Sequence, residues 1–246
     1  QTVRRSPGSY SLLVDAETRD VVYTVDKRID LGTDVTTGPW STSQLGEIID
    51  RLADAPIGDT VISDTSLYVP ARGQPVIFLA AAIRDGSNVI GAVVTELPTA
   101  ALTSLVTAGG GWTALGLGET GDVYIVGRDG TLRTDQRLWS EDPERFLADG
   151  VGDDAAITDQ IGRAGSPVLL QRVDNAAVET ALLGKQFIGS VDNGLGEATL
   201  AASGPIVAGD LDWVVVVEQS RAETNRSLRH LMRATLLVMT ILLPLT

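Results

Sequence analysis

The sequence predicts an α+β fold with two antiparallel-sheet modules in tandem, followed by the start of a transmembrane helix. Three observations lead to this prediction. A pattern of strand hairpin, polar helical middle, second strand hairpin and helix occurs twice along the chain. Each copy closes on a long apolar run, at residues 91–95 and 213–217, as expected of central strands covered on both faces. Residues 234–246 are almost entirely apolar.

In the first copy, residues 11–15 and 20–25 read as strands joined by the turn 16–19. Residues 41–55 form a helix-rich, polar middle. Strands 75–83 and 89–97 follow, joined by a turn at 84–88 that contains Asp85 and Gly86, and residues 98–106 read as a helix. This copy gives the first module, residues 1–107.

The second copy opens with strands at 122–127 and 131–134, separated by a turn with Asp129 and Gly130, a strong hairpin signal. Helical residues 142–162 follow, then strands at 198–205 and 212–219 around a turn at 208–210. This gives a second module, residues 108–219, joined to the first through the flexible residues 109–111. The order of elements is that of two PAS-like sheets in series.

An exit helix is predicted at residues 220–231, because Ser220 and Glu223 have the spacing of a capping box. No Gly or Pro separates it from the apolar run, so we assign 220–233 to a juxtamembrane helix and 234–246 to the start of a membrane span. A span needs about 20 apolar residues, so we expect a fragment whose residues 1 to about 230 lie outside the cell membrane. The alternative is a buried C-terminal core helix.

Composition excludes several function classes. The formal charge of −13 argues against nucleic-acid binding, which needs clustered Lys and Arg. The absence of Cys excludes a thiol nucleophile and Cys-ligated zinc, and the single His, His230, lies at the membrane entry, far from any triad. Asp149, Asp153 and Asp154 lack EF-hand spacing and read as a solvated loop. We therefore expect no catalytic residue, no metal and no cofactor in this stretch.

Residues 116–137, GLGETGDVYIVGRDGTLRTDQR, resemble the membrane-proximal half of a double Cache (dCache) sensor domain, in which GLGxTGExYLVGxDGxxRSDSR recurs. Residues 20–34 (DVVYTVDKRIDLGTD), 38–40 (GPW), 64–70 (DTSLYVP) and 75–78 (PVIF) resemble its distal half. The resemblance covers roughly residues 8–222. The chain departs from the pattern in two ways: the family's long N-terminal helix is absent, and RSDSR reads RTDQR at 133–137.

The resemblance implies an extracellular ligand-sensing region. This variant looks most like that of actinobacterial membrane-bound class III adenylate or guanylate cyclases, which implies a homodimer and a cytoplasmic output that makes cAMP. The same sensor also precedes histidine kinases and chemoreceptors, and a ligand-free dimerisation module is a further alternative. An extracytoplasmic enzyme is the least compatible with the missing His and Cys.

A small-molecule pocket combines apolar walls with a few convergent polar groups. In the distal module, an aromatic, an ammonium and a carboxylate together suit an amino acid or organic acid. The candidate ligand-binding residues are Tyr23, Lys27, Asp30, Trp40, Asp64 and Tyr68, with Phe78 beside them. The alternatives are core packing for Tyr23 and Phe78, and a surface ion pair between Lys27 and Asp30.

In the proximal module, Arg133, Asp135 and Arg137 alternate, which places all three on one face of a strand. They form either an anion site or a network that holds the strand to the following helices, and we favour the network. Trp112, Trp139 and Trp213 are expected in core or inter-module packing.

Overall fold

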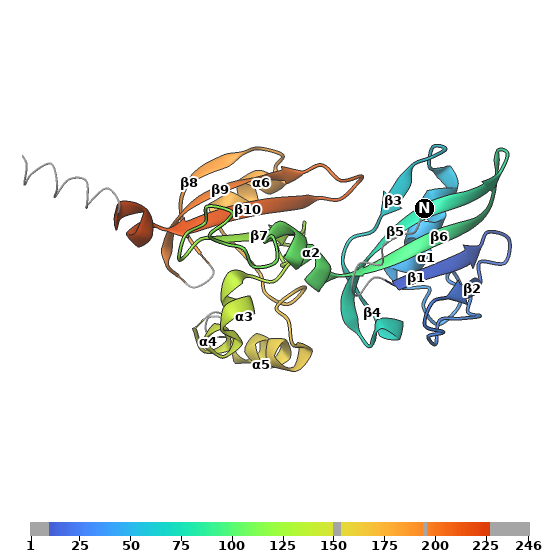
Figure 1. Ribbon diagram of the computed structural model, residues 1–246, viewed down its shortest axis with the longest axis horizontal. Helices are drawn as coiled ribbons and strands as arrows, with labels where there is room; N and C mark the ends of the chain where they lie inside the picture. Colours follow the sequence, from blue (N-terminus) through green and yellow to red (C-terminus); the bar gives the residue numbers. More distant parts are fainter. Residues whose placement is uncertain (1–9, 150–153, 194–195, 227–246) are drawn as a thin grey trace, which may run out of the picture.

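The computed structural model describes residues 10–149, 154–193 and 196–226 of the 246-residue chain. Two antiparallel sheets with flanking helices lie one after the other along the long axis of the molecule (Figure 1). The predicted α+β architecture with two antiparallel sheets is confirmed.

The first sheet has the strand order β2-β1-β6-β5-β3, with β4 also paired to β5. Its strands are β1 (Tyr10–Asp15), β2 (Val21–Thr24), β3 (Thr60–Ile62), β4 (Ser66–Tyr68), β5 (Gln74–Asp85) and β6 (Asn88–Pro98). The helix α1 (Gln44–Asp54) and a short 3-10 helix η1 (Val69–Ala71) accompany them. The strand β6 lies between β1 and β5, which explains its uninterrupted apolar run.

One face of this sheet and α1 form the first core. Along β1, alternate residues Tyr10, Leu12 and Val14 are buried, as the two-residue period of a strand requires. The helix contributes Leu45, Ile48, Ile49 and Leu52, spaced to lie along one face of α1. The irregular segment 25–43 packs over the same core, to which Val35 and Trp40 belong.

The second sheet has the order β7-β10-β9-β8. Its strands are β7 (Asp122–Val126), β8 (Phe187–Asp192), β9 (Ala198–Ile206) and β10 (Trp213–Ser220), and its helices are α3 (Arg137–Glu141), α4 (Pro143–Asp149), α5 (Ala155–Ala164) and α6 (Ala176–Leu182). Helix α6 packs on this sheet through Val178 and Ala181, against Tyr124 and Val216. Asp154 and Asn175 cap α5 and α6 by accepting backbone N–H bonds.

The helix α2 (Thr99–Val106) lies between the two sheets (Figure 1). Beside it, Ile77 of β5 meets Ile125 of β7 and Trp213 of β10 in one buried apolar cluster. Arg51 of α1 also pairs with Asp210 of the second module at 3.0 Å. Side chains from both modules therefore share a packed interface.

Most predicted elements are present. The opening strands β1, β2 and β7, the closing hairpins β5–β6 and β9–β10, and the helices α1 and α2 lie where the sequence places them. The strand at 131–134 is wrong, because these residues form only isolated bridges, to Val126 and Arg172. The short strands β3, β4 and β8 and the helices α3 and α6 were not predicted.

Residues 221–226 are helical, at the start of the predicted exit helix. Within the described residues, no helix has both the length and the apolar character needed to cross a membrane. The predicted span at 234–246 and most of the juxtamembrane helix lie outside the described residues, as does His230.

Candidate functional site

The candidate site is a group of buried polar side chains in the first module, here called the distal polar cluster. Its members come from β1, β2, the segment 25–43 and the region of β4, and Tyr10, Trp40 and Tyr68 among them pack in the core that α1 covers. The cluster consists of Tyr10, Thr24, Asp30, Trp40, Thr65, Ser66 and Tyr68.

Asp30 and Tyr68 form the centre of this cluster. Asp30 is fully buried, and its Oδ2 accepts a hydrogen bond of 2.9 Å from the Tyr68 hydroxyl. Burial raises the pKa of Tyr68 above its ordinary value, and the negative charge of Asp30 raises it further, so Tyr68 stays a proton donor. The ring of Tyr68 is fixed by an edge-on contact with Phe78, with centroids 5.1 Å apart.

An ion pair lies beside this centre. The Arg28 guanidinium donates to both oxygens of Glu96, at 3.0 and 2.9 Å, and its carbon lies 3.7 Å from the centre of the Tyr10 ring. Burial raises the pKa of Glu96, and the hydrogen bond from Arg28 opposes that rise. The charge of Arg28 is therefore committed to Glu96, and Asp30 is left without a cationic partner among the described residues.

Several atoms of the cluster are buried without a hydrogen-bond partner, which is rare in native proteins. They are Asp30 Oδ1, Trp40 Nε1 and the hydroxyl oxygens of Thr65 and Ser66, whereas the hydroxyls of Tyr10 and Thr24 lie next to each other. Each such group costs about 1–3 kcal/mol when left unsatisfied. They include one carboxylate acceptor and several possible donors, which are the kinds of group that bind the ammonium and carboxylate ends of a zwitterion.

The six predicted ligand-binding residues do not lie together. Asp30 and Tyr68 are in direct contact, and Trp40 packs against the same core. Tyr23 is 53% exposed on β2, so the alternative of core packing is wrong for Tyr23 and right for Phe78, which is fully buried. Lys27 is exposed while Asp30 is buried, so the alternative of a surface ion pair between them is also wrong.

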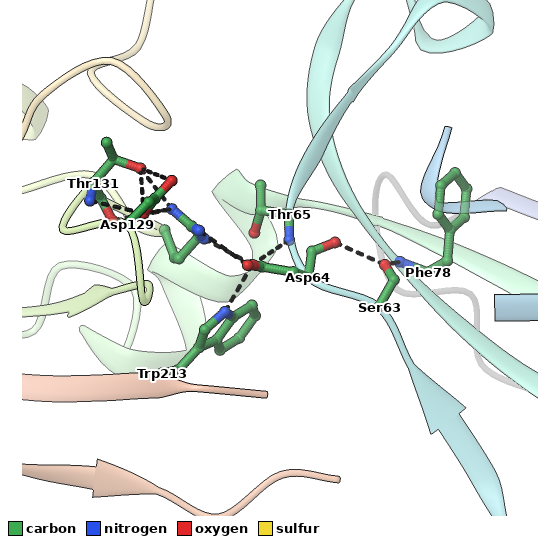
Figure 2. Close-up of polar contacts among 8 residues, drawn as sticks. Ser63, Asp64, Thr65, Phe78, Asp129, Thr131 and Trp213 are labelled. Atoms are coloured by element: carbon green, nitrogen blue, oxygen red, sulfur yellow. Dashed lines mark hydrogen bonds and ion pairs between the residues drawn. The ribbon is translucent and has the colours of Figure 1, made fainter. Parts of the chain in front are cut away.

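Asp64, the sixth predicted residue, lies at the junction of the two modules (Figure 2). Its carboxylate accepts bonds from Arg133 Nε and a terminal guanidinium nitrogen at 2.7 and 2.9 Å, and from Trp213 Nε1 at 2.7 Å. Both donors belong to the second module. The neighbouring Ser63 ties the same loop to β5, because its hydroxyl accepts the Phe78 N–H at 2.9 Å.

The predicted one-face arrangement of Arg133, Asp135 and Arg137 is wrong, because this segment is not a strand and Arg137 begins α3. The structural reading of these residues fits their contacts. Arg133 binds Asp64, Asp135 accepts a bond of 2.7 Å from Ser166, and Arg137 pairs with Glu141 at 2.9 Å. Trp112 and Trp213 are buried as expected, and Trp139 packs edge-on against Phe146.

Sequence reasoning missed Tyr10, Arg28 and Glu96. Tyr10 and Glu96 face each other across β1 and β6, 86 positions apart in the chain, so no local pattern connects them. The usable signal was Glu96 itself, a charged residue inside an apolar strand expected to be buried on both faces. Among the described residues, no group of three acidic or His side chains is arranged to hold a metal ion.

No protein-family model and no curated protein matches this sequence. Solved structures do resemble its fold. The ligand-binding domain of the Pseudomonas aeruginosa PAO1 amino acid chemoreceptor PctB, in complex with L-Arg, is 16% identical, with a TM-score of 0.50 over 87% of this chain and 72% of that chain. The ligand-binding domain of the Pseudomonas fluorescens chemoreceptor CtaA, in complex with L-isoleucine, is 16% identical, with a TM-score of 0.49 over 87% of this chain and 69% of that chain. The likeness to PctB is one of fold.

Proposed function

We propose that this chain is the extracellular sensor region of a membrane receptor, of the double Cache type, and that the distal polar cluster binds a small zwitterion such as an amino acid. The buried atoms without partners carry this proposal. A ligand ammonium group would bind Asp30 Oδ1, and a ligand carboxylate would accept bonds from Trp40 Nε1 and the nearby hydroxyls.

The path of the signal follows from the junction contacts. Thr65 and Asp64 are adjacent: Thr65 belongs to the distal polar cluster, and Asp64 binds Arg133 and Trp213 of the second module. Trp213 begins β10, and β10 ends at Ser220, where the exit helix starts. A ligand that orders Thr65 would thus favour one position of Asp64 and, through β10, of the exit helix.

The proposed output is a cytoplasmic class III adenylate cyclase that makes cAMP and works as a homodimer anchored through the residues after 226. The resemblance of residues 116–137 to the cyclase-linked variant supports this choice. A chemoreceptor is the second candidate, because PctB shares the fold. A histidine kinase would use the same arrangement.

The test is a thermal-shift screen of the chain against amino acids and organic acids. A ligand at 100 times its dissociation constant adds about 2.7 kcal/mol of stability. We expect Asp30→Asn and Trp40→Phe to abolish the shift given by a hit, because they remove the free acceptor and the free donor. Tyr23→Phe and Lys27→Ala are matched controls at exposed positions and should leave it unchanged.

Two outcomes would contradict the proposal. If no amino acid or organic acid shifts the melting temperature, the ligand-free module becomes the better description. If a hit survives both Asp30→Asn and Trp40→Phe, the ligand binds elsewhere in the chain.

A further inference from the structure

A cavity lies in the proximal module, next to the exit helix and away from the distal polar cluster. It has a volume of about 200 Å³ and is bounded by β7, β10, α3, α4 and the loop before β7. At about 30 Å³ for each water-sized group, this is room for about six or seven non-hydrogen atoms. We call it the proximal cavity.

The charges that line the proximal cavity are strongly unbalanced. It is lined by five carboxylates, those of Glu119, Asp122, Glu141, Glu197 and Glu218, and by two guanidiniums, those of Arg137 and Arg145. Arg137 is already engaged, with Glu141 and with the carbonyl oxygens of Gly118 and Gly121. Arg145 pairs with Asp149 at 3.6 Å. Both cations therefore already have partners.

Two of these carboxylates lie directly opposite each other on neighbouring strands of the sheet. Asp122 on β7 and Glu218 on β10 are register partners, with 8% and 5% of their surface exposed. Like charges directly opposite each other on neighbouring strands are destabilising. Within the described residues, no Lys or Arg nitrogen lies within ion-pair distance of either group.

Their hydrogen bonds leave one side free. The oxygens of Asp122 accept the N–H groups of Val123 and Arg137, at 2.7 and 2.9 Å. Glu218 accepts a bond of 3.2 Å from the Tyr124 hydroxyl through Oε2, and within the described part of the chain its Oε1 accepts none. A buried carboxylate ordinarily has a cation or a metal as partner. Asp122 and Glu218 both line the proximal cavity, which has room for such a cation.

We propose that the proximal cavity binds a small organic cation, with a primary ammonium group held between Asp122 and Glu218. Of the other carboxylates that line the cavity, Glu119 pairs with Arg226 and Glu141 with Arg137, so Glu197 is the one that suits a second positive charge on the ligand. A linear diamine with about six non-hydrogen atoms fits the volume.

The site is connected to the exit helix. Glu223, in the first turn of that helix, accepts the backbone N–H groups of Glu119 and Thr120, both at 2.8 Å, and the Thr120 hydroxyl. We call these contacts the exit-helix clamp. The predicted capping box is thus only half formed: Ser220 accepts the Ala222 N–H at 3.2 Å, while Glu223 turns to the loop instead. Because Glu119 and Thr120 also line the cavity, an occupant contacts the residues that hold the helix.

Protons compete with an organic cation for this site. Burial raises the pKa of Asp122 to about 6, and burial together with the charge of Asp122 raises the pKa of Glu218 to about 7. At pH 8, above both pKa values, Asp122 and Glu218 are ionised and their negative charges favour binding of a cation. At pH 5.5 Glu218 carries a proton, so an ammonium group should bind at least tenfold more weakly.

The test is isothermal titration of the full chain in mild detergent at pH 8, with putrescine as the probe. 1,4-Butanediol is the neutral control, since it has the size of putrescine without its charges, and Mg²⁺ tests for simple charge screening. We expect saturable binding of an amine, at least tenfold weaker in Glu218→Gln and at pH 5.5. Glu144→Gln removes one exposed carboxylate of α4 that does not line the cavity and should bind as the wild type does.

Asp122→Asn provides a second variant if Glu218→Gln fails to fold. No saturable amine binding at pH 8 would overturn the proposal and leave the pair as a proton site. The proposal would also be overturned if Mg²⁺ bound as well as the amine, or if Glu144→Gln weakened amine binding as much as Glu218→Gln does. Either result would mean that the amine binds through general surface charge. The amine titration and the thermal-shift screen with amino acids are separate measurements with separate variants, so this proposal and the proposed function can fail separately.

Discussion

The contact between Asp64 and the second module gives the sharpest stability prediction. Asp64→Asn keeps the size of the side chain but removes its charge and one acceptor oxygen. The remaining amide oxygen can serve only part of the three bonds from Arg133 and Trp213, and the amide N–H₂ faces donors. Among the described residues, Arg133, whose side chain is 4% exposed, then keeps only Asp129 as an ionic partner, at 3.1 Å.

A hydrogen bond to a charged group is worth about 1.5–3 kcal/mol. The Asp64 side chain is 37% exposed, so solvent screening places the expected loss near the lower end, at about 2 kcal/mol. For a chain of this length, that corresponds to a fall in melting temperature of about 4–8 °C.

The assay is guanidinium chloride unfolding of the wild type and the variant, followed by Trp fluorescence, with calorimetry for the melting temperature. Asp159→Asn is the matched control, because Asp159 and Arg163 pair at the surface with 55% and 76% of their side chains exposed. It should change the stability by less than about 0.5 kcal/mol. A double-mutant cycle of Asp64→Asn with Arg133→Gln should give a coupling energy of about 1 kcal/mol or more.

The reasoning would be refuted if Asp64→Asn were as stable as Asp159→Asn. It would also fail if the two junction substitutions were additive, because Asp64 and Arg133 would then act independently.

Three further predictions concern the exit-helix clamp, the cavity carboxylates and the distal polar cluster. Gly118→Ala should destabilise the chain in denaturant by about 1–2 kcal/mol more than Gly116→Ala. Both glycines have positive φ, but a Cβ at 118 would lie 2.3 Å from the Glu223 carboxylate, whereas one at 116 would have no atom within 4 Å. Equal losses of stability would contradict the exit-helix clamp. Because the pKa of Glu218 is raised to about 7 in the folded state, the folded state binds the extra proton and stability falls as the pH rises from about 4.5 to 7. Glu218→Gln should remove that part of the slope and be up to about 3 kcal/mol more stable than the wild type at pH 8, which unfolding at pH 5 and pH 8 would check; an unchanged slope would show that this carboxyl is ionised at pH 5. Tyr68→Phe should lower the stability measured by calorimetry by about 2 kcal/mol, because the buried Asp30 carboxylate loses its hydrogen-bond donor. Tyr23→Phe, at an exposed position, should lower it by less than about 0.5 kcal/mol. Similar losses in the two variants would contradict the buried site.

The sequence by itself determined the architecture, because its signals are local. The two-residue alternation of β1, the apolar runs of β6 and β10 and the hairpin turns each depend on neighbours within a few positions. The short strands β4 and β8 carry too few residues to show such a pattern, and residues 131–134 show one that the contacts around Arg172 override.

Only the tertiary structure decided which polar groups meet. Asp30 and Asp64 look alike in sequence, yet one is fully buried against Tyr68 and the other binds Arg133 of the second module. Asp122 and Glu218 become partners only through the register of β7 and β10, whose strands are about 90 residues apart in the chain. Register between distant strands depends on packing of the whole sheet, and no periodicity within one strand encodes it.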